Sequence, residues 1–361
     1  RERGVTLKVR KKIALKISGK MMLIITLLMA ALFLAGCGQG KVPAQSISEP
    51  LKVALVLDQG GLGDGGFNDA AHRGLTRAKE DFSDKLEIST VTPKDMESME
   101  AELKRIAQNQ TDLVIAMGYY YTDILPQVAA AYPDIKFVLI DNKLPDLKAE
   151  GNLISLTFKD QEGAFLAGAA AALKSRTGKI GFVGGVEVPA VKNFEAGYTA
   201  GAKHINPGIK IYTAYAAPGL EGFSLPEKGK ELALEQIGDG ADVIFHAAGA
   251  TGLGVFEAVA EKKVLAIGVD LDQTFVVPEA QRPYILTSVL KGVDVAVYDV
   301  IKLRLEDKLT GGYLTLGLKD GVENYAENEV NKELLTEIKP RLDEIKQQIA
   351  GGAFTVSGFE E

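Results

Sequence analysis

Acidic, amide and aromatic side chains recur in this chain at the points where apolar runs of strand length end. Aromatic rings can stack on a planar base, and carboxylates can accept hydrogen bonds from vicinal hydroxyls. Few arginines stand among them, whereas a phosphate or an amino-acid carboxylate usually binds a bidentate guanidinium. We therefore expect a neutral, flat, hydroxylated ligand. The candidate residues are Asp58, Phe67, Asn68, Tyr119, Tyr120, Tyr121, Asp141, Phe223, Gly249, Asp270 and Lys291.

Side chains typical of catalytic and metal sites are scattered or absent in the sequence. The three histidines, His72, His204 and His246, lie far apart, and Cys37 is the one cysteine. No G-x-S-x-G, H-E-x-x-H or Walker lysine sequence occurs. We therefore expect a binding protein rather than an enzyme, without a metal or another cofactor.

A glycine-rich loop, residues 60–66, follows the first apolar run and precedes a predicted helix. It contains G-x-G-x-x-G, so a dinucleotide site is an alternative. That match is weak, because the loop beginning at Asp58 is longer than the turn of such sites and Asp64 would place a carboxylate beside the pyrophosphate. Ligands of open α/β sheets bind at the carboxyl ends of strands, so we expect this loop to form one side of a binding site. Asn68 or Asp69 is expected to cap the helix that follows.

Short apolar runs alternate with amphipathic segments from residue 51 onward. The runs are almost continuous in Val, Ile, Leu and Phe, which is typical of parallel strands covered by helices on both faces. Right-handed helical connections between such strands build doubly wound sheets. We expect strands at 53–57, 113–117, 137–140, 152–157, 179–183, 242–248, 264–269 and 284–289. The expected helices lie at 96–108, 161–173, 227–237, 252–261 and 329–352, the last with a break at Pro340.

A weak internal repeat relates two parts of the chain. Three residues recur at identical separations, since Lys52, Phe67 and Gly74 are matched by Lys179, Phe194 and Gly201. Each set runs from an apolar strand through a glycine-containing loop to an aromatic residue and a helix. We therefore expect two similarly built α/β halves, with a change of domain near residues 156–161.

The first 36 residues are expected to be a signal peptide rather than part of the fold. Basic residues gather at positions 8–20, and a short apolar run at 21–34 leads into Leu-Ala-Gly-Cys. This sequence matches the lipobox of bacterial lipoproteins. We therefore expect a lipid on Cys37, a flexible tether at 37–50, and a location on the extracytoplasmic face of the cell membrane.

Removal of the signal peptide would change the net charge from −7 to about −14, because residues 1–36 hold eight of the 41 basic side chains and one of the 48 acidic ones. Such an acidic body is repelled by nucleic acid and by anionic lipid headgroups. We therefore expect no nucleic-acid partner, and membrane contact only through the lipid on Cys37.

Several blocks of the sequence resemble the basic membrane protein family of lipoproteins, the purine-nucleoside receptors of ABC transporters. The resemblance covers nearly all of residues 51–306. It implies an α/β protein of the type I periplasmic-binding-protein fold, with two doubly wound parallel-sheet lobes joined by a three-stranded hinge. The matching blocks are Asp58 with 60–68 and Gly74, then 163–172, 178–202, 241–258, 267–273 and 285–297.

The resemblance also implies the arrangement and the partners of the lobes. The N-terminal lobe is expected at residues 51–157 and 290–312, and the C-terminal lobe at 158–289 and 313–361. The lobes would close over a nucleoside of the inosine, guanosine or adenosine class by rotation about the hinge. The partners would be an ABC permease and its ATPase, and the binding protein itself is expected to be a monomer.

For the base of the nucleoside, the resemblance implies a stack between two aromatic rings. Phe67 would supply one ring and Phe223 the other, with Phe194 as the alternative for the second. Asn68 would read the base edge. Asp58 would touch the base or support the glycine-rich loop.

For the ribose, the resemblance implies contacts from Asp141, Asp270 and Lys291, with Gly249 allowing close approach of the backbone. The chain departs from the family in the loop, which usually carries acid-Lys-Ser where residues 64–66 are Asp-Gly-Gly. The preferred base therefore stays open. Two other functions are also open, namely a sugar-binding protein of the same fold and a secreted nucleoside hydrolase or dehydrogenase.

Overall fold

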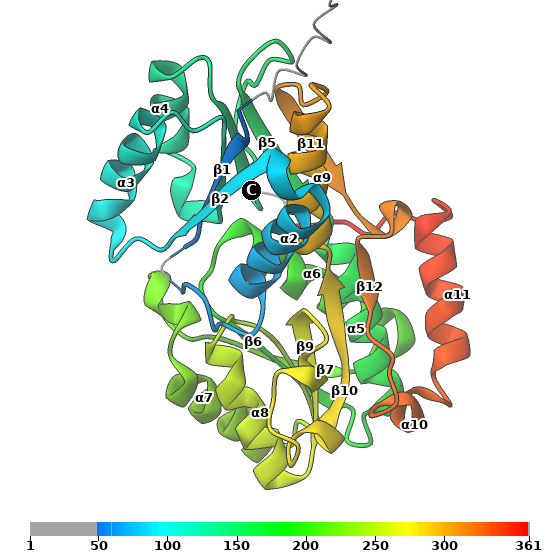
Figure 1. The fold of residues 1–361 in the computed structure, drawn as a ribbon. Coiled ribbons are helices and arrows are strands. Elements are labelled where there is room, and N and C mark those ends of the chain that lie inside the picture. The colour runs from blue at the N-terminus through cyan, green and yellow to red at the C-terminus, as the bar shows by residue number, and fades with distance from the viewer. Residues whose placement is uncertain (1–48, 59, 360–361) are drawn as a thin grey trace, which may run out of the picture. The chain divides into compact units, whose positions relative to one another are not determined.

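The computed structural model describes residues 49–58 and 60–359, which form alternating strands and helices (Figure 1). The expected signal peptide and the lipid site at Cys37 lie outside these residues, as does nearly all of the expected tether. Within the described ranges, no helix is both long and apolar enough to cross a membrane.

The first lobe contains a six-stranded sheet with the strand order β11-β5-β4-β3-β1-β2, in which all neighbours are parallel. Consecutive residues of its central strands point to opposite faces, and both faces are buried. Leu55 packs on one side, for example, and Val56 on the other. The strands are β1 (Leu51–Val56), β2 (Leu86–Val91), β3 (Leu113–Met117), β4 (Lys136–Ile140), β5 (Leu153–Phe158) and β11 (Gly312–Leu316).

Helices cover both faces of this sheet. The helices α2 (Phe67–Phe82) and α9 (Val293–Leu305) pack side by side on one face, and α3 (Met96–Gln108) and α4 (Leu125–Ala131) cover the other (Figure 1). The contact between α2 and α9 is close because Gly74 has no side chain. A Cβ at that position would lie 2.3 Å from a backbone oxygen of α9.

The second lobe repeats this arrangement with the strand order β12-β10-β9-β8-β6-β7. All neighbours are parallel except β12, which pairs antiparallel with β10. Its strands are β6 (Lys179–Gly184), β7 (Lys210–Tyr215), β8 (Val243–Ala247), β9 (Leu265–Asp270), β10 (Ile285–Lys291) and β12 (Glu323–Tyr325). Its helices are α5 (Asp160–Lys174), α6 (Pro189–Ile205) and α11 (Lys339–Ala350) on one face, and α7 (Pro226–Gly238) and α8 (Thr251–Lys262) on the other.

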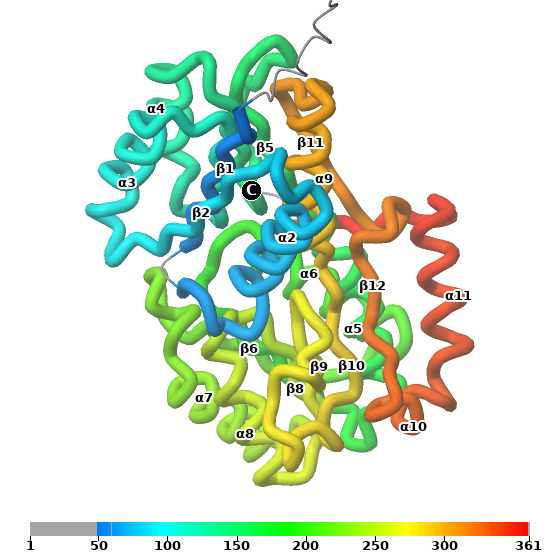
Figure 2. The backbone as a smooth tube through the Cα atoms, viewed as in Figure 1, coloured from blue at the N-terminus to red at the C-terminus, as the bar shows by residue number. Residues whose placement is uncertain are grey.

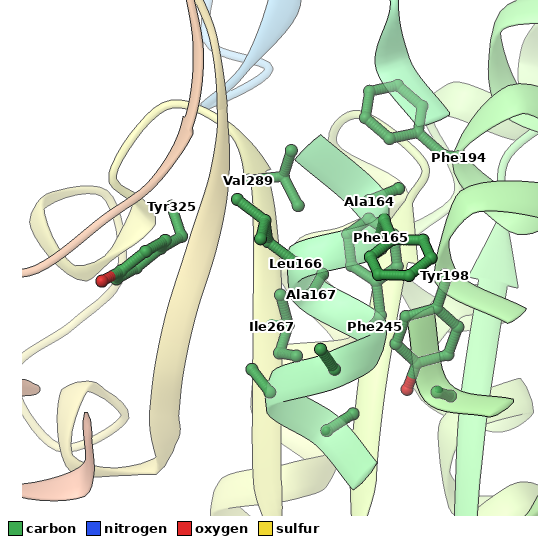
Figure 3. Packing of buried hydrophobic residues seen from close by; sticks show 14 of the residues in the cluster. Ala164, Phe165, Leu166, Ala167, Phe194, Tyr198, Phe245, Ile267, Val289 and Tyr325 are labelled. Carbon is green, nitrogen blue, oxygen red and sulfur yellow. The ribbon is translucent and has the colours of Figure 1, made fainter. Parts of the chain in front are cut away.

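The core of the second lobe is built around close contact between α5 and α6. A Cβ at Gly168 would lie 2.0 Å from the backbone oxygen of Tyr198, and one at Gly201 would lie 1.9 Å from that of Phe165. The glycines therefore let the two backbones touch, while the aromatic rings fill the space beside the sheet. Figure 3 shows Phe165, Tyr198 and Phe245 in this cluster and Phe194 at one end of it.

The predicted fold class and all eight predicted strands are confirmed. Four further strands, β2, β7, β11 and β12, were not predicted. Their sequences are short or mix polar with apolar residues, because most of them lie at sheet edges with one side partly in water. The predicted repeat corresponds to β1 with α2 in the first lobe and β6 with α6 in the second.

The chain passes between the sheets three times, after β5, after β10 and after β11. Two details differ from the expected division. The strand β10 continues to Lys291 within the second sheet, and β11 occupies residues 312–316 in the first sheet because it pairs along its length with β5. The crossing segments are joined by backbone hydrogen bonds, including one of 2.8 Å from Lys159 N to Leu316 O and one of 2.7 Å from Gly292 N to Val322 O.

The C-terminal segment forms two helices instead of the single broken helix that was expected. They are α10 (Lys332–Leu335) and α11. Pro340 lies in the first turn of α11 rather than at the break, a position where the missing N–H of proline costs nothing. Figure 2 shows α11 at the outer side of the second lobe, where it packs on α5.

Candidate functional site

A cavity lies between the two lobes, at the carboxyl ends of strands from both sheets. Side chains of the first lobe form one wall and side chains of the second lobe form the other. All eight residues predicted to bind the ligand line it, namely Asp58, Phe67, Asn68, Asp141, Phe223, Gly249, Asp270 and Lys291. The geometry therefore brings the whole predicted set together.

The ammonium group of Lys291 is the most enclosed polar group of the site, because its side chain is only 1% exposed. Its Nζ donates to Asp141 Oδ1 at 2.6 Å and lies 2.9 Å from Asp160 Oδ1. Burial alone would lower the pKa of Lys291, but the charges of Asp141, Asp160 and Asp270 outweigh it and raise the pKa above its usual value. The group is therefore a permanent cation at neutral pH.

Three aromatic rings surround the same ammonium group. Lys291 Nζ lies 5.5 Å from the centroid of Phe67, 5.0 Å from Phe158 and 5.2 Å from Phe194. Ring faces carry partial negative charge and attract cations at these distances. The rings also exclude water from Lys291. Phe67 and Phe194, the matched aromatics of the internal repeat, thus face the same cation from opposite lobes.

Asp141 and Asp270 occupy equivalent places at the ends of β4 and β9, the corresponding strands of the two sheets. Both have a left-handed backbone, with φ of 73° and 65°, which is uncommon outside glycine and is often found at functional sites. Burial raises the pKa of Asp270 to about 7, although Lys291 lowers it, and burial likewise raises the pKa of Asp141. Among the described residues, no donor reaches the carboxylate of Asp270, so its oxygens are free to accept hydrogen bonds from a ligand.

The glycine-rich loop is held by two carboxylates, because Asp69 accepts from Gly63 N and Gly65 N while Asp64 binds the first turn of α2. Asp64 accepts hydrogen bonds from the backbone N–H groups of Gly66, Asn68 and Asp69, at 3.0, 2.8 and 3.2 Å. The capping prediction for Asn68 and Asp69 was therefore wrong, because α2 begins one residue earlier, at Phe67. The N-terminus of α2 already binds this carboxylate, so the loop has no free N–H cluster for a pyrophosphate.

Asn68 also orients Asp58. Its Nδ2 donates to Asp58 Oδ1 at 2.7 Å and to Asp64 Oδ2 at 3.1 Å, which uses both N–H groups of the amide. Asp58 Oδ1 further accepts from Gly60 N at 2.8 Å. Burial raises the pKa of Asp58 to about 6, against the lowering effect of the bond from Asn68.

The loop contacts the second lobe directly. Gln273 Nε2 donates to Gly65 O at 3.0 Å across the cleft. A Cβ at Gly65 would lie 2.6 Å from Val276 Cγ1, and one at Gly66 would lie 2.8 Å from Asp270 Oδ2. The pair of glycines at 65 and 66 therefore permits this close approach of the lobes.

Phe223 and Phe194 differ in their surroundings. Phe223 is half-buried at the end of a short 3-10 helix, and its ring packs over the backbone of Gly185. Gly249, with φ of 53°, lies against the backbone of Phe223, where a Cβ would come within 3.1 Å of its oxygen. Phe194 is 4% exposed and packs edge-on against Phe245 in the core. Both line the cavity, but Phe223 keeps more of its surface free.

The structure adds residues that the sequence reasoning did not assign to the site. Leu220 and Val188 add apolar wall. Of the three candidate tyrosines after β3, Tyr119 and Tyr120 line the cavity, whereas Tyr121 is buried and donates to Leu57 O at 2.8 Å. Asp160 was missed altogether, because its only indication in the sequence is its position just after a predicted strand. No arginine lines the cavity among the described residues, and no group of three or more His, Cys, Asp or Glu there could hold a metal ion.

These features define a class of protein, a ligand-binding protein of the type I periplasmic-binding-protein fold with its site between two lobes. The family model for PnrA-like ABC transporter substrate-binding proteins matches residues 51–356. The chain belongs to this family. It is therefore a substrate-binding protein of ABC transport rather than an enzyme.

Relatives in the family cover nearly the whole chain. Basic membrane protein A of Borreliella burgdorferi is 34% identical over 94% of this chain and 96% of its own length. An uncharacterized lipoprotein of Pyrococcus abyssi is 35% identical, with 87% of this chain and 80% of that protein covered.

Solved structures of solute-binding proteins have the same fold. An ABC transporter solute-binding protein of Aeropyrum pernix K1 matches with a TM-score of 0.77 and 28% identity, covering 86% of this chain and 94% of that chain. A periplasmic solute-binding protein of Actinobacillus succinogenes with bound D-allose matches with a TM-score of 0.59 at 16% identity, covering 79% and 99%, which shows the fold alone.

Proposed function

We propose that this chain is a lipid-anchored receptor that captures purine nucleosides outside the cell membrane and delivers them to an ABC permease and its ATPase. The observation that carries the proposal is the composition of the cavity. Two half-buried aromatic side chains, Phe67 and Phe223, stand on opposite lobes, and the acids Asp141 and Asp270 flank the buried cation Lys291. Rings suit a planar base, and a carboxylate whose oxygens are free suits a ribose diol.

The charge of the site supports a nucleoside over a nucleotide. Lys291 is the one basic side chain along the cavity among the described residues, and its ammonium group is already engaged by Asp141 at 2.6 Å. Asp58, Asp64 and Asp270 add further negative charge to the wall. A phosphate would be repelled there and would find no guanidinium.

Thermal denaturation tests this function, because a ligand that binds only the native state raises the melting temperature. Inosine, guanosine or adenosine at saturating concentration should raise it, whereas D-ribose alone and adenosine 5′-monophosphate should have little effect. Phe223→Ala should weaken nucleoside binding roughly tenfold or more, because base–aromatic stacking contributes about 1–3 kcal/mol. Phe275→Ala is the matched control, since Phe275 is 70% exposed and outside the cavity.

A sugar-binding protein of the same fold is the second candidate, because the solute-binding neighbours include proteins described as sugar transporters and one with bound D-allose. A sugar site needs one aromatic face rather than two. The sugar-binding function would replace the nucleoside-binding function if a free sugar raised the melting temperature and no nucleoside did. Phe223→Ala should in that case have little effect on sugar binding.

The anchor belongs to the same proposal. Cys37 follows the lipobox sequence, and relatives in the family are named lipoproteins. In a bacterial host, the full chain should incorporate labelled palmitate and fractionate with membranes. Cys37→Ser should abolish both, while nucleoside binding by the folded residues should be unchanged.

A further inference from the structure

Each of the three segments that cross between the lobes contributes one ionisable residue to a single buried cluster. Asp160 follows the first crossing after β5, Lys291 precedes the second at the end of β10, and Glu323 follows the third at the start of β12. The side chains of Lys291 and Asp160 are 1% and 2% exposed, and residue Glu323 is 1% exposed. The cluster therefore lies inside the hinge, and Lys291 connects it to the cavity.

The ammonium group of Lys291 interacts with a residue of the hinge and with a residue of the cavity wall. An ammonium group has three N–H donors. Asp141, at the cavity wall of the first lobe, takes one at 2.6 Å, and Asp160, at the first residue of α5, lies 2.9 Å away on the hinge side. Asp141 accepts a hydrogen bond from Nζ and Asp160 adds an ion-pair contact without one, so donors of the ammonium group remain for an oxygen of the ligand.

Glu323 completes the cluster as a further buried acid. It stands opposite Lys291 in the antiparallel register of β10 and β12, and a Cβ at Gly163 of α5 would come within 2.4 Å of its Oε2. Neither of its carboxylate oxygens has a hydrogen-bond partner among the described residues. Burial, with the nearby charge of Asp160, raises the pKa of Glu323 well above its usual value.

We propose that Asp160 is a positioning residue for ligand binding, which holds the ammonium group of Lys291 at the point where the hinge meets the cavity. The proposal rests on the proposed function in that the ligand is a nucleoside. When Asp160 is ionised, it competes with Asp141 for the ammonium group and keeps Nζ between the two carboxylates. When Asp160 is neutral, Nζ is drawn toward Asp141, and its free donor no longer points at the same place.

Asp160→Asn tests this, because asparagine has the shape of aspartate and stays neutral at every pH. Burial raises the pKa of Asp160 to about 8, although Lys291 lowers it, so wild type and variant carry the same charge at about pH 6.5 and differ at about pH 9. The other acidic groups that face Lys291, namely Asp141, Asp270 and Glu323, are present in both proteins. The comparison therefore reports the loss of the Asp160 charge, together with its effect on the titration of these neighbours.

The dissociation constant is measured by calorimetry at both pH values with the tightest-binding of inosine, guanosine and adenosine. Wild type and Asp160→Asn should agree within about twofold at pH 6.5. At pH 9 the variant should bind about tenfold more weakly, which is the order of one hydrogen bond to a charged group. At pH 9 and without ligand, the melting temperature of Asp160→Asn should equal or exceed that of wild type, because a neutral buried amide costs less to desolvate than a carboxylate.

Two matched variants separate positioning from general damage to the hinge. Glu162→Gln changes a buried carboxylate of the same helix that accepts from Leu318 N at 2.9 Å but does not touch Lys291. Glu323→Gln changes a buried acid of the hinge that accepts no hydrogen bond from Lys291. Both should follow the wild-type pH profile.

The inference is overturned if the dissociation constants of Asp160→Asn and wild type agree at both pH values, or differ by the same factor at both. It is also overturned if Glu162→Gln binds as weakly as Asp160→Asn at pH 9. Absence of nucleoside binding by wild type would instead refute the proposed function. The same variants would then be compared with D-allose, and equal affinities at pH 9 would refute the positioning role.

Discussion

Replacement of Lys291 by methionine should destabilise the protein strongly, and by an amount that depends on pH. Methionine fills a similar volume but leaves Asp141 and Asp160 buried beside each other without their cation. Removal of one partner from a buried ion pair typically costs about 3–5 kcal/mol. For a folded body of this size, that corresponds to a fall in melting temperature of roughly 6–10 °C.

The sign of the pH dependence follows from the remaining carboxylates. Burial raises the pKa values of Asp141 and Asp160 above the unfolded value of 3.8, and the charge of Lys291 lowers both. Without Lys291 the two folded-state pKa values should therefore lie higher still. Groups of this kind bind more protons in the folded state, so stability falls as the pH rises through their folded pKa values. The difference in stability between wild type and Lys291→Met should therefore be larger at about pH 8 than at about pH 5, and should grow further above pH 8.

Calorimetric or fluorescence melting of both proteins across this pH range is the assay. Lys230→Met is the control, because Lys230 pairs with Glu257 and Glu261 at the surface, where an ion pair contributes about 0–1 kcal/mol. The reasoning would be refuted if Lys291→Met and wild type had the same melting temperature at pH 8. A loss that is equal at pH 5 and pH 8 would also refute it, because the unpaired carboxylates would then not be its cause.

Three further outcomes follow from the same geometry. Wild type without ligand should gain stability as the pH is lowered from about 8 to 6. Burial raises the folded pKa of Asp160 to about 8, of Asp270 to about 7 and of Asp58 to about 6, so each group binds a proton more readily in the folded state. A melting temperature that stays constant over this range would contradict the prediction. Gly201→Val should unfold the second lobe or lower its melting temperature by many degrees, because a Cβ there would lie 1.9 Å from a backbone oxygen, as circular dichroism melting can show. Asp64→Ala should cost about 1–2 kcal/mol in denaturant unfolding, because the first turn of α2 loses its acceptor.

Much of the fold was predictable because the central strands are buried on both faces. Continuous apolar runs such as residues 113–117 can lie only inside a covered sheet, and β3 coincides with that run. The edge strands β2 and β7 face water on part of their surface and use residues common in loops. No local pattern distinguishes such segments, since their strand conformation is set by pairing with β1 and β6.

The site was predictable to the extent that parallel strands deliver their carboxyl ends to one place. Asp141 and Asp270 follow predicted strands, and they face each other across the cavity for that reason. Asp160 was not predictable, because its partner Lys291 is distant in sequence and meets it only through the hinge. The cap by Asp64 was missed because a carboxylate three residues before a helix reaches the first turn only in this loop conformation.

The most direct test of the account is a calorimetric titration of the protein, unfolded and refolded to remove bound ligand, with inosine, guanosine, adenosine, D-ribose and D-allose. The account predicts that at least one purine nucleoside binds with one site per chain and that neither sugar competes with it. Saturation by a sugar with no heat from any nucleoside, or no binding by any nucleoside, would contradict it.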